Sequence, residues 1–338
     1  MNRLYRCALY LAATAALGAA PLAAQTPAPA PQVTVGGLVY AQYLYQDFPT
    51  AGVRQNNFSI QRAYINVIGR FAGGIYTRVT MDVYSPPAGT TDNSRTYRLK
   101  YAYFGYTPNG SPLTFKLGAI HTPWLDWEEA LWDYRVQGQM ALERGGYLTS
   151  SDFGAGVDYK QGPDKINGQF VIVNGEGYAG GPGDFRKDAE VRLSARVMDT
   201  DDSSRVGGLR LTGYAGIGKA TGGADRNRFI GMASYRTKQI TIAGEFASTK
   251  DGLVAVTGSV ISAFGVYKLN NSKFAALARL DITDPNTSVA NDKQTRIIGG
   301  VSCQVSPNLR LLADLDHLSF EAGTTAHNLG LFQAQINF

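Results

Sequence analysis

The sequence predicts an all-β fold, a transmembrane antiparallel β-barrel of about sixteen strands, and three observations lead to this prediction. From Val33 onward the chain alternates apolar and polar residues over segments of about ten residues, with the period of a β-strand. Short turns and long loops alternate between these segments. The first residues have the features of an export signal, so we expect the chain to leave the cytoplasm.

The segment MNRLYRCALYLAATAALGAAPLAAQ predicts a secretory signal peptide at 1–24. Arg3 and Arg6 precede an apolar run, and small residues follow it, so we expect cleavage near Ala24. The apolar run is short for a membrane-spanning helix, although a retained anchor helix is the alternative. The chain is therefore expected to be exported.

The rest of the chain divides into a short Pro/Ala-rich segment at 25–32 and the barrel at 33–338. Removal of the signal leaves Cys303 as the single cysteine, which excludes an internal disulfide. The formal net charge of +5 falls to about +3 when the two arginines of the signal are removed. This mild charge, with no basic motif interleaved with aromatic residues, argues against nucleic acid as a partner.

Each predicted strand is a two-faced segment. In RAYINVIGRF, for example, Ala63, Ile65 and Val67 share one face, whereas Arg62 and Asn66 share the other. The same pattern predicts strands at 33–46, 58–71, 74–84, 97–107, 112–121, 153–160, 165–174, 188–199, 207–218, 228–238, 240–249, 259–270, 273–283, 295–305, 309–320 and 327–338.

The connections between these strands alternate in length. AGG, PNGS, QGPD, TKQ, NNS and SPN are tight turns with Gly, Pro, Asn or Asp at the turning positions. Between them lie longer loops such as DFPTAGVRQNN, SPPAGTTDNSRT and NGEGYAGGPGDFRK, and the connection at about 122–152 is the longest. Short turns at one end and long loops at the other are typical of an outer-membrane barrel.

A soluble β-sandwich would show the same two-faced strands, with the apolar face as its core. In a barrel the apolar face meets lipid and the polar face lines a wet lumen. The alternation of connections and the signal peptide favour the barrel, and closure also removes the unpaired edges that lipid would penalise. The last strand, ending QAQINF, is then expected to pair with the first and close the barrel.

The stretches FSIQRAYINVIGRF and YRLKYAYFGYT, followed by LTFKLGAIHTPW, resemble the phosphate-selective porin O/P family. Gly118 and Pro123 match the bracket at the start of that family's long loop, Glu128 and Glu129 resemble the acidic pair that follows, and FGAGVDY resembles the returning strand. The resemblance implies a sixteen-stranded barrel in the bacterial outer membrane, a third loop folded into the pore, and a homotrimer. It also implies that Phe338, as an aromatic C-terminal residue, is the signal read by the barrel-assembly machinery.

The sequence departs from that family where selectivity is set. Phosphate-selective members carry an arginine ladder and loop lysines, whereas the long loop here is acidic. The fifth loop, near 219–227, offers Lys219 and Arg226 but no lysine cluster. The resemblance therefore supports the fold better than it supports phosphate binding.

The long loop is the candidate constriction, because Trp124, Trp127 and Leu131 recur at helical spacing and predict a short helix. An ordered extracellular lid is the alternative. A loop of this length without order is uncommon, which favours the inward position. The constriction residues would be Trp124, Asp126, Trp127, Glu128, Glu129, Asp133 and Arg135.

Basic residues take the inward phase in four consecutive strands and predict a basic wall along part of the lumen. Acidic residues of the same phase are fewer: Asp82, Glu190, Glu245, Asp281, Asp314 and Asp316. We therefore expect modest anion preference, although local pairing of these charges is the alternative. The wall would consist of Arg62, Arg78, Arg98, Lys100 and Lys116, and further lumen candidates are Arg192, Arg196, Arg210, Arg279 and Arg296.

Other chemistries find little support. The three histidines, His121, His317 and His327, show no spacing of a hydrolase. MDTDDSSR at 198–205 could bind calcium but is better explained as a solvated turn, and GKATGG lacks the spacing of a phosphate-binding loop. We expect no enzyme activity, no cofactor and no metal site.

Two functions remain open. The first is an outer-membrane porin that gives passive diffusion to small hydrophilic solutes, with a modest anion preference that could extend to phosphate. The second is a plugged structural or receptor barrel without significant conductance. Sixteen strands leave an aqueous channel unless something fills it, and no separate plug domain is visible in the sequence. The partners expected are membrane lipid, small anionic or neutral solutes and further copies of the chain.

Overall fold

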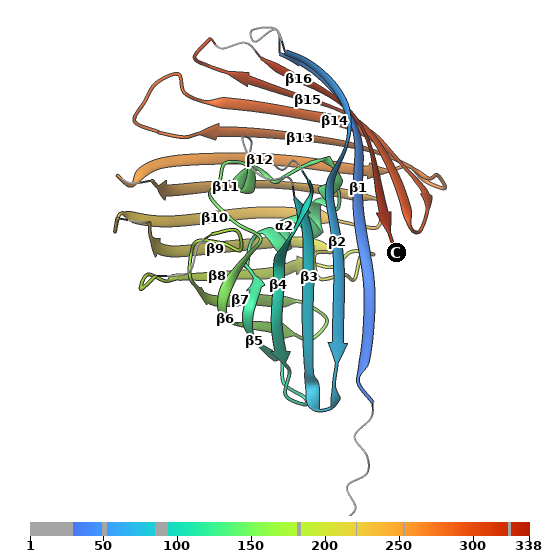
Figure 1. Cartoon of the computed structure of the whole chain (residues 1–338), viewed down its shortest axis with the longest axis vertical. Helices are drawn as coiled ribbons and strands as arrows, with labels where there is room; N and C mark the ends of the chain where they lie inside the picture. Colours follow the sequence, from blue (N-terminus) through green and yellow to red (C-terminus); the bar gives the residue numbers. More distant parts are fainter. Residues whose placement is uncertain are drawn as a thin grey trace, which may run out of the picture.

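A computed structural model describes residues 30–48, 53–84, 94–180, 184–220, 222–252, 254–323 and 326–338. Sixteen antiparallel strands form one closed barrel, in which each strand pairs with its neighbours in sequence and β1 pairs with β16 (Figure 1). The predicted fold class is thereby confirmed, and the sandwich alternative is excluded. Among the described residues, no helix is long and apolar enough to cross a membrane.

The strands follow the predicted order along the whole barrel. Their bounds are β1 (Gln32–Phe48), β2 (Val53–Arg70), β3 (Ile75–Tyr84), β4 (Thr96–Tyr106), β5 (Leu113–His121), β6 (Ser151–Gln161), β7 (Ile166–Val173), β8 (Asp188–Met198), β9 (Gly208–Lys219), β10 (Asp225–Arg236), β11 (Ile240–Asp251), β12 (Val256–Lys268), β13 (Phe274–Asp284), β14 (Gln294–Ser306), β15 (Leu309–Phe320) and β16 (His327–Asn337).

The largest difference from the predicted strands lies at the first hairpin. The sequence predicts a loop at 47–57, but β1 continues to Phe48 and β2 begins at Val53. Gln46 pairs with Gln55 and Tyr45 with Asn56 in regular register. The sequence of this part of the hairpin lacks the alternation of apolar and polar residues that predicts the other strands. Pairing of the backbone continues there because it does not depend on an apolar face.

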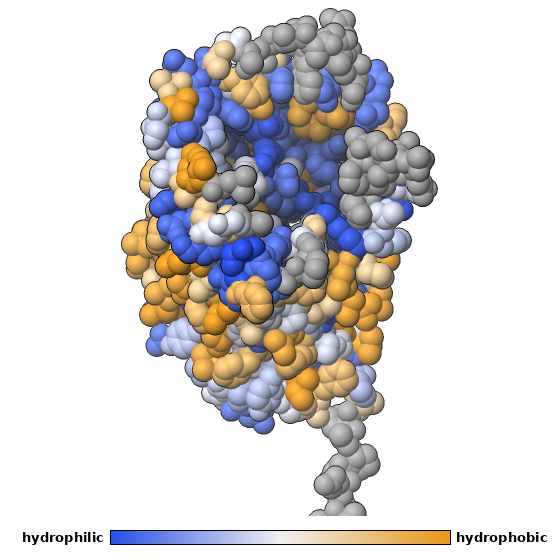
Figure 2. All heavy atoms as spheres, turned by 60° about the vertical axis from the view of Figure 1, so that its left-hand side comes forward, coloured by the Kyte–Doolittle hydropathy of each residue, from blue (hydrophilic) through white to orange (hydrophobic). Residues whose placement is uncertain are grey.

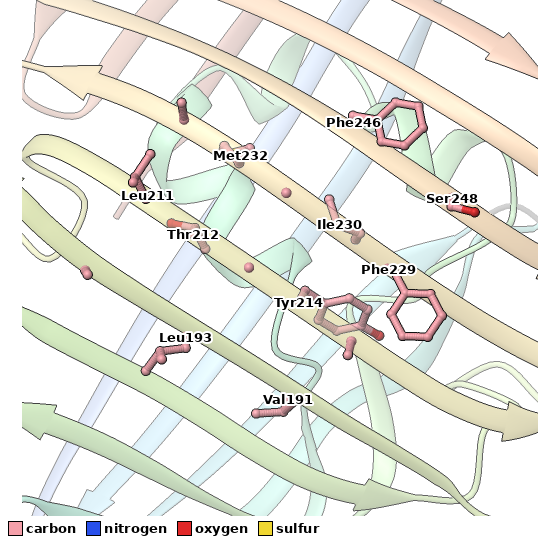
Figure 3. Close-up of a pocket in the computed structure, with 15 residues that line it drawn as sticks. Val191, Leu193, Leu211, Thr212, Tyr214, Phe229, Ile230, Met232, Phe246 and Ser248 are labelled. Carbon is pink, nitrogen blue, oxygen red and sulfur yellow. The ribbon is translucent and has the colours of Figure 1, made fainter.

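The two faces of the wall differ as the alternation predicts. In β3, Val79 and Met81 are 41% and 36% exposed, whereas Thr80 and Asp82 are each 1% exposed. Figure 2 shows hydrophilic residues lining the hollow that opens in this view, with hydrophobic residues over the outer wall below it. Figure 3 shows a pocket of the wall of β8–β11, with apolar side chains around it. Apolar residues thus cover the outside of the barrel, and most charged residues of the strands point inside, together with buried apolar residues such as Phe264 and Ile298.

The barrel closes where the C-terminal residue meets β1. The Gly37 N–H donates to the Phe338 carbonyl at 2.7 Å, and the Phe338 N–H donates to the Gly37 carbonyl at 3.1 Å. A Cβ on Gly37 would lie 2.0 Å from the Phe338 ring, so the ring lies over the bare backbone of that glycine. The predicted signal peptide at 1–24 and most of the segment at 25–32 lie outside the described residues.

Deleting Phe338, or replacing it with Asp, should reduce the amount of folded barrel that the chain forms. Deletion removes both hydrogen bonds to Gly37, and each variant removes the aromatic ring at the closing seam. The heat-dependent mobility shift of the folded barrel in gel electrophoresis measures this amount. Phe320→Asp, at the opposite end of the neighbouring strand β15, is the matched control. Unchanged folded barrel in both Phe338 variants would exclude the assembly role.

Candidate functional site

The longest connection, 122–150, joins β5 to β6 and contains most of the helix in the described chain. It holds α2 (Leu125–Trp132), the 3-10 turn η2 (Arg135–Gln137) and α3 (Ala141–Arg144). The helix predicted from the spacing of Trp124, Trp127 and Leu131 is present as α2, and all three side chains are buried. Asp133 ends α2 in a left-handed conformation (φ 59°), with its N–H bonded to the Glu129 carbonyl at 2.9 Å.

Gly118 lets β4 and β5 approach closely just before this segment begins. Its φ is +129°, and a Cβ there would lie 2.2 Å from the Ala102 carbonyl oxygen, so no larger residue fits. At the base of the segment the Thr122 N–H donates to the Ser150 carbonyl at 3.3 Å. The two ends of the segment are therefore held together where it leaves the wall.

The segment packs on side chains that take the inward phase of the later strands. The Tyr134 hydroxyl lies 2.8 Å from the Ser302 hydroxyl of β14. Trp132 packs edge-on against Phe264 of β12, with 5.1 Å between ring centroids. Arg310 of β15 donates to the Asp133 carbonyl at 2.5 Å. These contacts place α2 inside the ring of strands, as Figure 1 shows.

Arginines predicted as lumen candidates hold this segment and the short turns in place. Arg192 donates to the Pro123 carbonyl at 3.0 Å and lies over the Trp127 ring at 4.4 Å. Arg279 donates to the Gln139 carbonyl at 3.1 Å and pairs with Asp281 at 2.7 Å. Arg210 donates to the Gly207 carbonyl at 2.9 Å, and Arg196 donates to the Ser204 carbonyl at 2.6 Å, both in the turn between β8 and β9. Arg296 pairs with the Asp316 carboxylate at 2.6 Å.

On the opposite wall, three of the five predicted basic residues have carboxylate partners. Arg62 lies 3.6 Å from Asp82 and 3.5 Å from Glu143 of the long segment. Arg98 pairs with the same Asp82 carboxylate at 3.0 Å. Lys116 pairs with Asp158 of β6. Local pairing therefore offsets the charge of these three residues.

Arg78 and Lys100 differ from the other three, because no carboxylate of the described residues lies within 4.0 Å of their nitrogens. Arg78 donates to Asn66 and Thr80, each at 3.0 Å, and lies 3.1 Å from the His121 ring nitrogen. Lys100 donates to the Tyr64 hydroxyl at 2.9 Å. Neutral partners fix the positions of both cations without offsetting their charge.

A β-bulge brings Lys100 and its neighbour Tyr101 to the same face. Thr80 pairs with Tyr101 and Met81 pairs with Leu99, so Lys100 is the extra residue of β4. Lys100 and Tyr101 are 3% and 7% exposed, which places both side chains on the inner face. Regular alternation would have put Tyr101 outside, so the sequence pattern missed this residue.

A polar cavity of about 310 Å³ separates the wall that carries Arg78 and Lys100 from the long segment. Its loop side carries Asp126, Glu129 and Asp133. Each of these carboxylates has a guanidinium partner: Arg205 for Asp126 (2.8 Å), Arg135 for Glu129 (2.7 Å) and Arg310 for Asp133 (3.2 Å). The loop carboxylates are thus offset, and the two wall cations carry the uncompensated charge beside this cavity.

Arg205 is a residue of this cavity that the sequence did not single out. It lies in the turn between β8 and β9, which has no periodic pattern to reveal an inward side chain. Burial raises the pKa of Asp126, but the nearby Arg205 guanidinium outweighs this and holds that pKa below its usual range. Asp126 therefore stays ionised, and its pairing with Arg205 persists at neutral pH.

A second contact of α2 joins two carboxyl groups. Glu128 is fully buried, and neither of its oxygens meets an N–H or O–H donor. The carboxyl of Glu245 from β11 lies beside it, with the Trp124 indole, Arg279 and Asp281 nearby. Two such carboxyls can bond to each other only through a shared proton. Burial, reinforced by Glu245, raises the pKa of Glu128 well above its usual range.

The barrel should be less stable at alkaline pH because of Glu128. Its folded-state pKa lies above the unfolded value, so its stabilising contribution is complete below the ordinary range of glutamate and is lost as pH rises through the raised pKa. We expect the thermal unfolding midpoint to fall by several degrees between about pH 5 and about pH 9. Glu128→Gln should reduce this fall, whereas the exposed control Glu321→Gln should not. An equal fall in both variants would contradict the shared proton.

The turn at 198–205 and the histidines add no further site. Within the described residues, no three His, Cys, Asp or Glu side chains gather in an arrangement that could hold a metal ion. Asp202 of this turn pairs with Arg236 at 2.8 Å. His121 stacks on Tyr101 with 3.9 Å between ring centroids, and His317 lies 2.7 Å from the Asn328 side chain.

No protein-family model matches the chain, and no curated protein matches its sequence. Solved structures of outer-membrane proteins do match its fold. The anion-selective porin from Comamonas acidovorans superposes with a TM-score of 0.66 and 14% identity, over 91% of this chain and 100% of that chain. OmpT of Vibrio cholerae, in its trimer form, gives 0.64 and 15%, over 91% and 100%. Salmonella typhi OmpF in complex with daunomycin gives 0.64 and 13%, over 90% and 97%. At these identities the likeness shows a shared barrel fold.

Proposed function

We propose that this chain is an outer-membrane porin that lets small hydrophilic solutes diffuse passively, with a modest preference for anions. The closed barrel with an apolar outside supports the membrane location, since each strand pairs with a neighbour on both sides and no sheet edge is left open. The polar inner face and the cavity beside the long segment support a wet passage. An anion-selective porin is among the proteins with the same fold.

The uncompensated pair Arg78 and Lys100 carries the proposed anion preference. In a wide pore, wall charges hardly act at the centre, because physiological salt screens them beyond about 8–10 Å. The long segment narrows the space in front of this pair, so a passing solute comes within the screening distance. The acidic loop residues would oppose an anion only if they were unpaired, and each has an arginine partner.

Specific phosphate binding has weaker support than general anion preference, although the resemblance to the phosphate-selective porin O/P family suggests it. The fifth loop offers Lys219, which pairs with Asp225 at 2.5 Å. The adjoining Arg226 pairs with Asp188 at 2.8 Å. Both cations are therefore paired with carboxylates, at the end of the barrel that carries the long loops. We infer weak anion attraction at the cavity of Arg78 and Lys100, without tight phosphate binding.

A plugged or receptor barrel is the second candidate, and one observation favours it. Trp124, Trp127 and Trp132 bury themselves against the inner wall and fill part of the lumen. A cavity beside them has a volume of about 310 Å³. A barrel filled in this way would show no conductance.

Assembly and export complete the proposal. We propose a homotrimer, since an outer-membrane protein with the same fold is known in a trimer form. We also propose that residues 1–24 direct export and that Phe338 is read by the barrel-assembly machinery.

Single-channel recording of the purified protein in a planar bilayer tests the function. A porin should give stepwise conductance, and a KCl gradient should give a reversal potential on the anion side that grows as salt is lowered. Absence of conductance from folded protein would favour the plugged barrel. Cation preference at low salt would contradict the role of Arg78 and Lys100.

A further inference from the structure

A second polar cavity, of about 370 Å³, lies at the long-loop end of the barrel. One side is the returning arm of the long segment, at 146–149, and the other is formed by β6 and β8–β11 with the connection that follows β7. Five carboxylates and two arginines line it. It shares no lining residue with the cavity of Arg78 and Lys100.

The carboxylates of this cavity outnumber their cationic partners. Arg226 pairs with Asp188 at 2.8 Å, and Arg228 pairs with Asp251. The other three carboxylates, Asp152, Glu176 and Glu190, have no arginine, lysine or histidine nitrogen of the described chain within 4.0 Å. Asp152 accepts two backbone N–H groups, from Phe153 at 2.6 Å and Gly175 at 2.7 Å. The cavity is therefore a site rich in hydrogen-bond acceptors.

Glu190 is the acceptor that most needs a partner. It is 8% exposed, it lines the cavity from β8, and its Oε2 meets no hydrogen-bond donor among the described residues. The Tyr214 hydroxyl lies beside the same carboxyl. A Cβ on Gly216 would lie 2.6 Å from that hydroxyl, so the glycine keeps the position of Tyr214 open. A buried carboxylate without a counter-charge is costly, and an arriving cation with N–H donors would relieve that cost.

We propose that this cavity binds an organic cation through a primary ammonium group. An ammonium brings three N–H donors, which suit the carboxylates of Glu190 and Glu176. Tyr147 and Tyr214 also line the cavity, and aromatic rings attract organic cations. A metal ion fits less well, because no acidic cluster of the described residues is arranged to hold one. The site lies at the mouth of the proposed pore. A role in binding solutes that pass through the pore rests on that proposed function.

Calorimetric titration of the folded barrel in detergent with 1,4-diaminobutane tests the site. We expect saturable binding that Glu190→Gln weakens by at least about tenfold, since the variant removes the charged acceptor of a hydrogen bond. Asp314→Asn is the matched control, because it removes one inward carboxylate from β15, outside this cavity. It should change the affinity by less than about twofold. Tetramethylammonium, which has no N–H donor, should bind at least about tenfold more weakly than the diamine.

Glu176→Gln provides a second variant for the case in which Glu190→Gln fails to fold. Glu176 lies in a half-exposed connection, so its replacement should leave the barrel intact. We expect it to weaken diamine binding severalfold. Equal diamine affinity in wild type and the folded Glu176 or Glu190 variants, equal affinity for tetramethylammonium, or no binding at all would each overturn the proposal.

Calorimetry needs no open pore. The test of the cation site is therefore independent of the conductance test of the proposed function. Diamine binding without conductance would leave the cation site standing and overturn the porin. Anion-selective conductance without diamine binding would leave the porin standing and overturn the cation site.

Discussion

Replacing Arg78 and Lys100 together with glutamine should move the reversal potential in a KCl gradient away from the anion side. These two cations lack carboxylate partners, so their removal changes the net charge beside the cavity. A unit charge at about 4 Å in water contributes about 1 kcal/mol, which is a factor of about five in local ion concentration. We therefore expect the ratio of chloride to potassium permeability to fall about fivefold or more at low salt and less at high salt.

The matched control for this double variant is Lys116→Gln with Asp158→Asn. It also removes two charged side chains from the inner wall, but the two form an ion pair, so the net charge stays the same. The control should keep the wild-type reversal potential. A shift of equal size in both double variants, or in neither, would contradict the assignment of the anion preference to the uncompensated pair.

Removing residues 124–134 and joining the ends with a short Gly/Ser linker should raise the single-channel conductance several-fold. This segment contains α2 and its three tryptophans, which lie against the inner wall of the barrel. Its removal leaves the lumen open across the region that the segment now fills. The anion preference should also weaken, because solutes would then pass farther from Arg78 and Lys100 than the screening length.

Shortening the connection at 285–293 is the control for the loop deletion. This connection joins β13 to β14 at the same end of the barrel, and none of its residues lines the cavity of Arg78 and Lys100. It should leave the conductance unchanged. Wild-type conductance from a folded barrel that lacks 124–134 would show that the segment does not restrict the passage.

The barrel could be predicted well from the sequence because the outer and inner faces of its wall differ in polarity on alternate residues. In β3, Val79 and Met81 face outward, whereas Thr80 and Asp82 face inward. The sequence of this strand therefore alternates apolar and polar residues with a period of two. The turns could be predicted equally well, since Gly, Pro, Asn and Asp favour the backbone conformations that tight turns require. The prediction fails at 47–57, where the sequence does not alternate apolar and polar residues.

The charge pattern of the lumen could not be predicted in the same way. Arg62, Arg98 and Lys116 have the same inward phase as Arg78, and only the register and the long segment decide which of them meet a carboxylate. Arg62 pairs with Glu143, which lies 81 positions later and reaches it only because the long segment lies inside. The bulge that turns Lys100 and Tyr101 to one face has no signature in the alternation. The sequence predicts which side chains of a strand point into the lumen. The net charge at a given place in the lumen depends on tertiary contacts, which the sequence does not show.

The anchoring of the long segment has a consequence for the order in which the molecule folds. Tyr134 binds Ser302, 168 residues away, and Gln137 binds Asp314, 177 residues away. Ser302 and Asp314 lie in β14 and β15, which are synthesised long after the long segment. Contacts between residues so far apart in the sequence form late in folding. Until β14 and β15 join the wall, Tyr134 and Gln137 lack these partners, so the part of the segment that follows α2 is not yet anchored and can promote aggregation. Anchoring of Tyr134 and Gln137 should therefore be among the last events of refolding, after the tryptophans have packed on β8, β9 and β12.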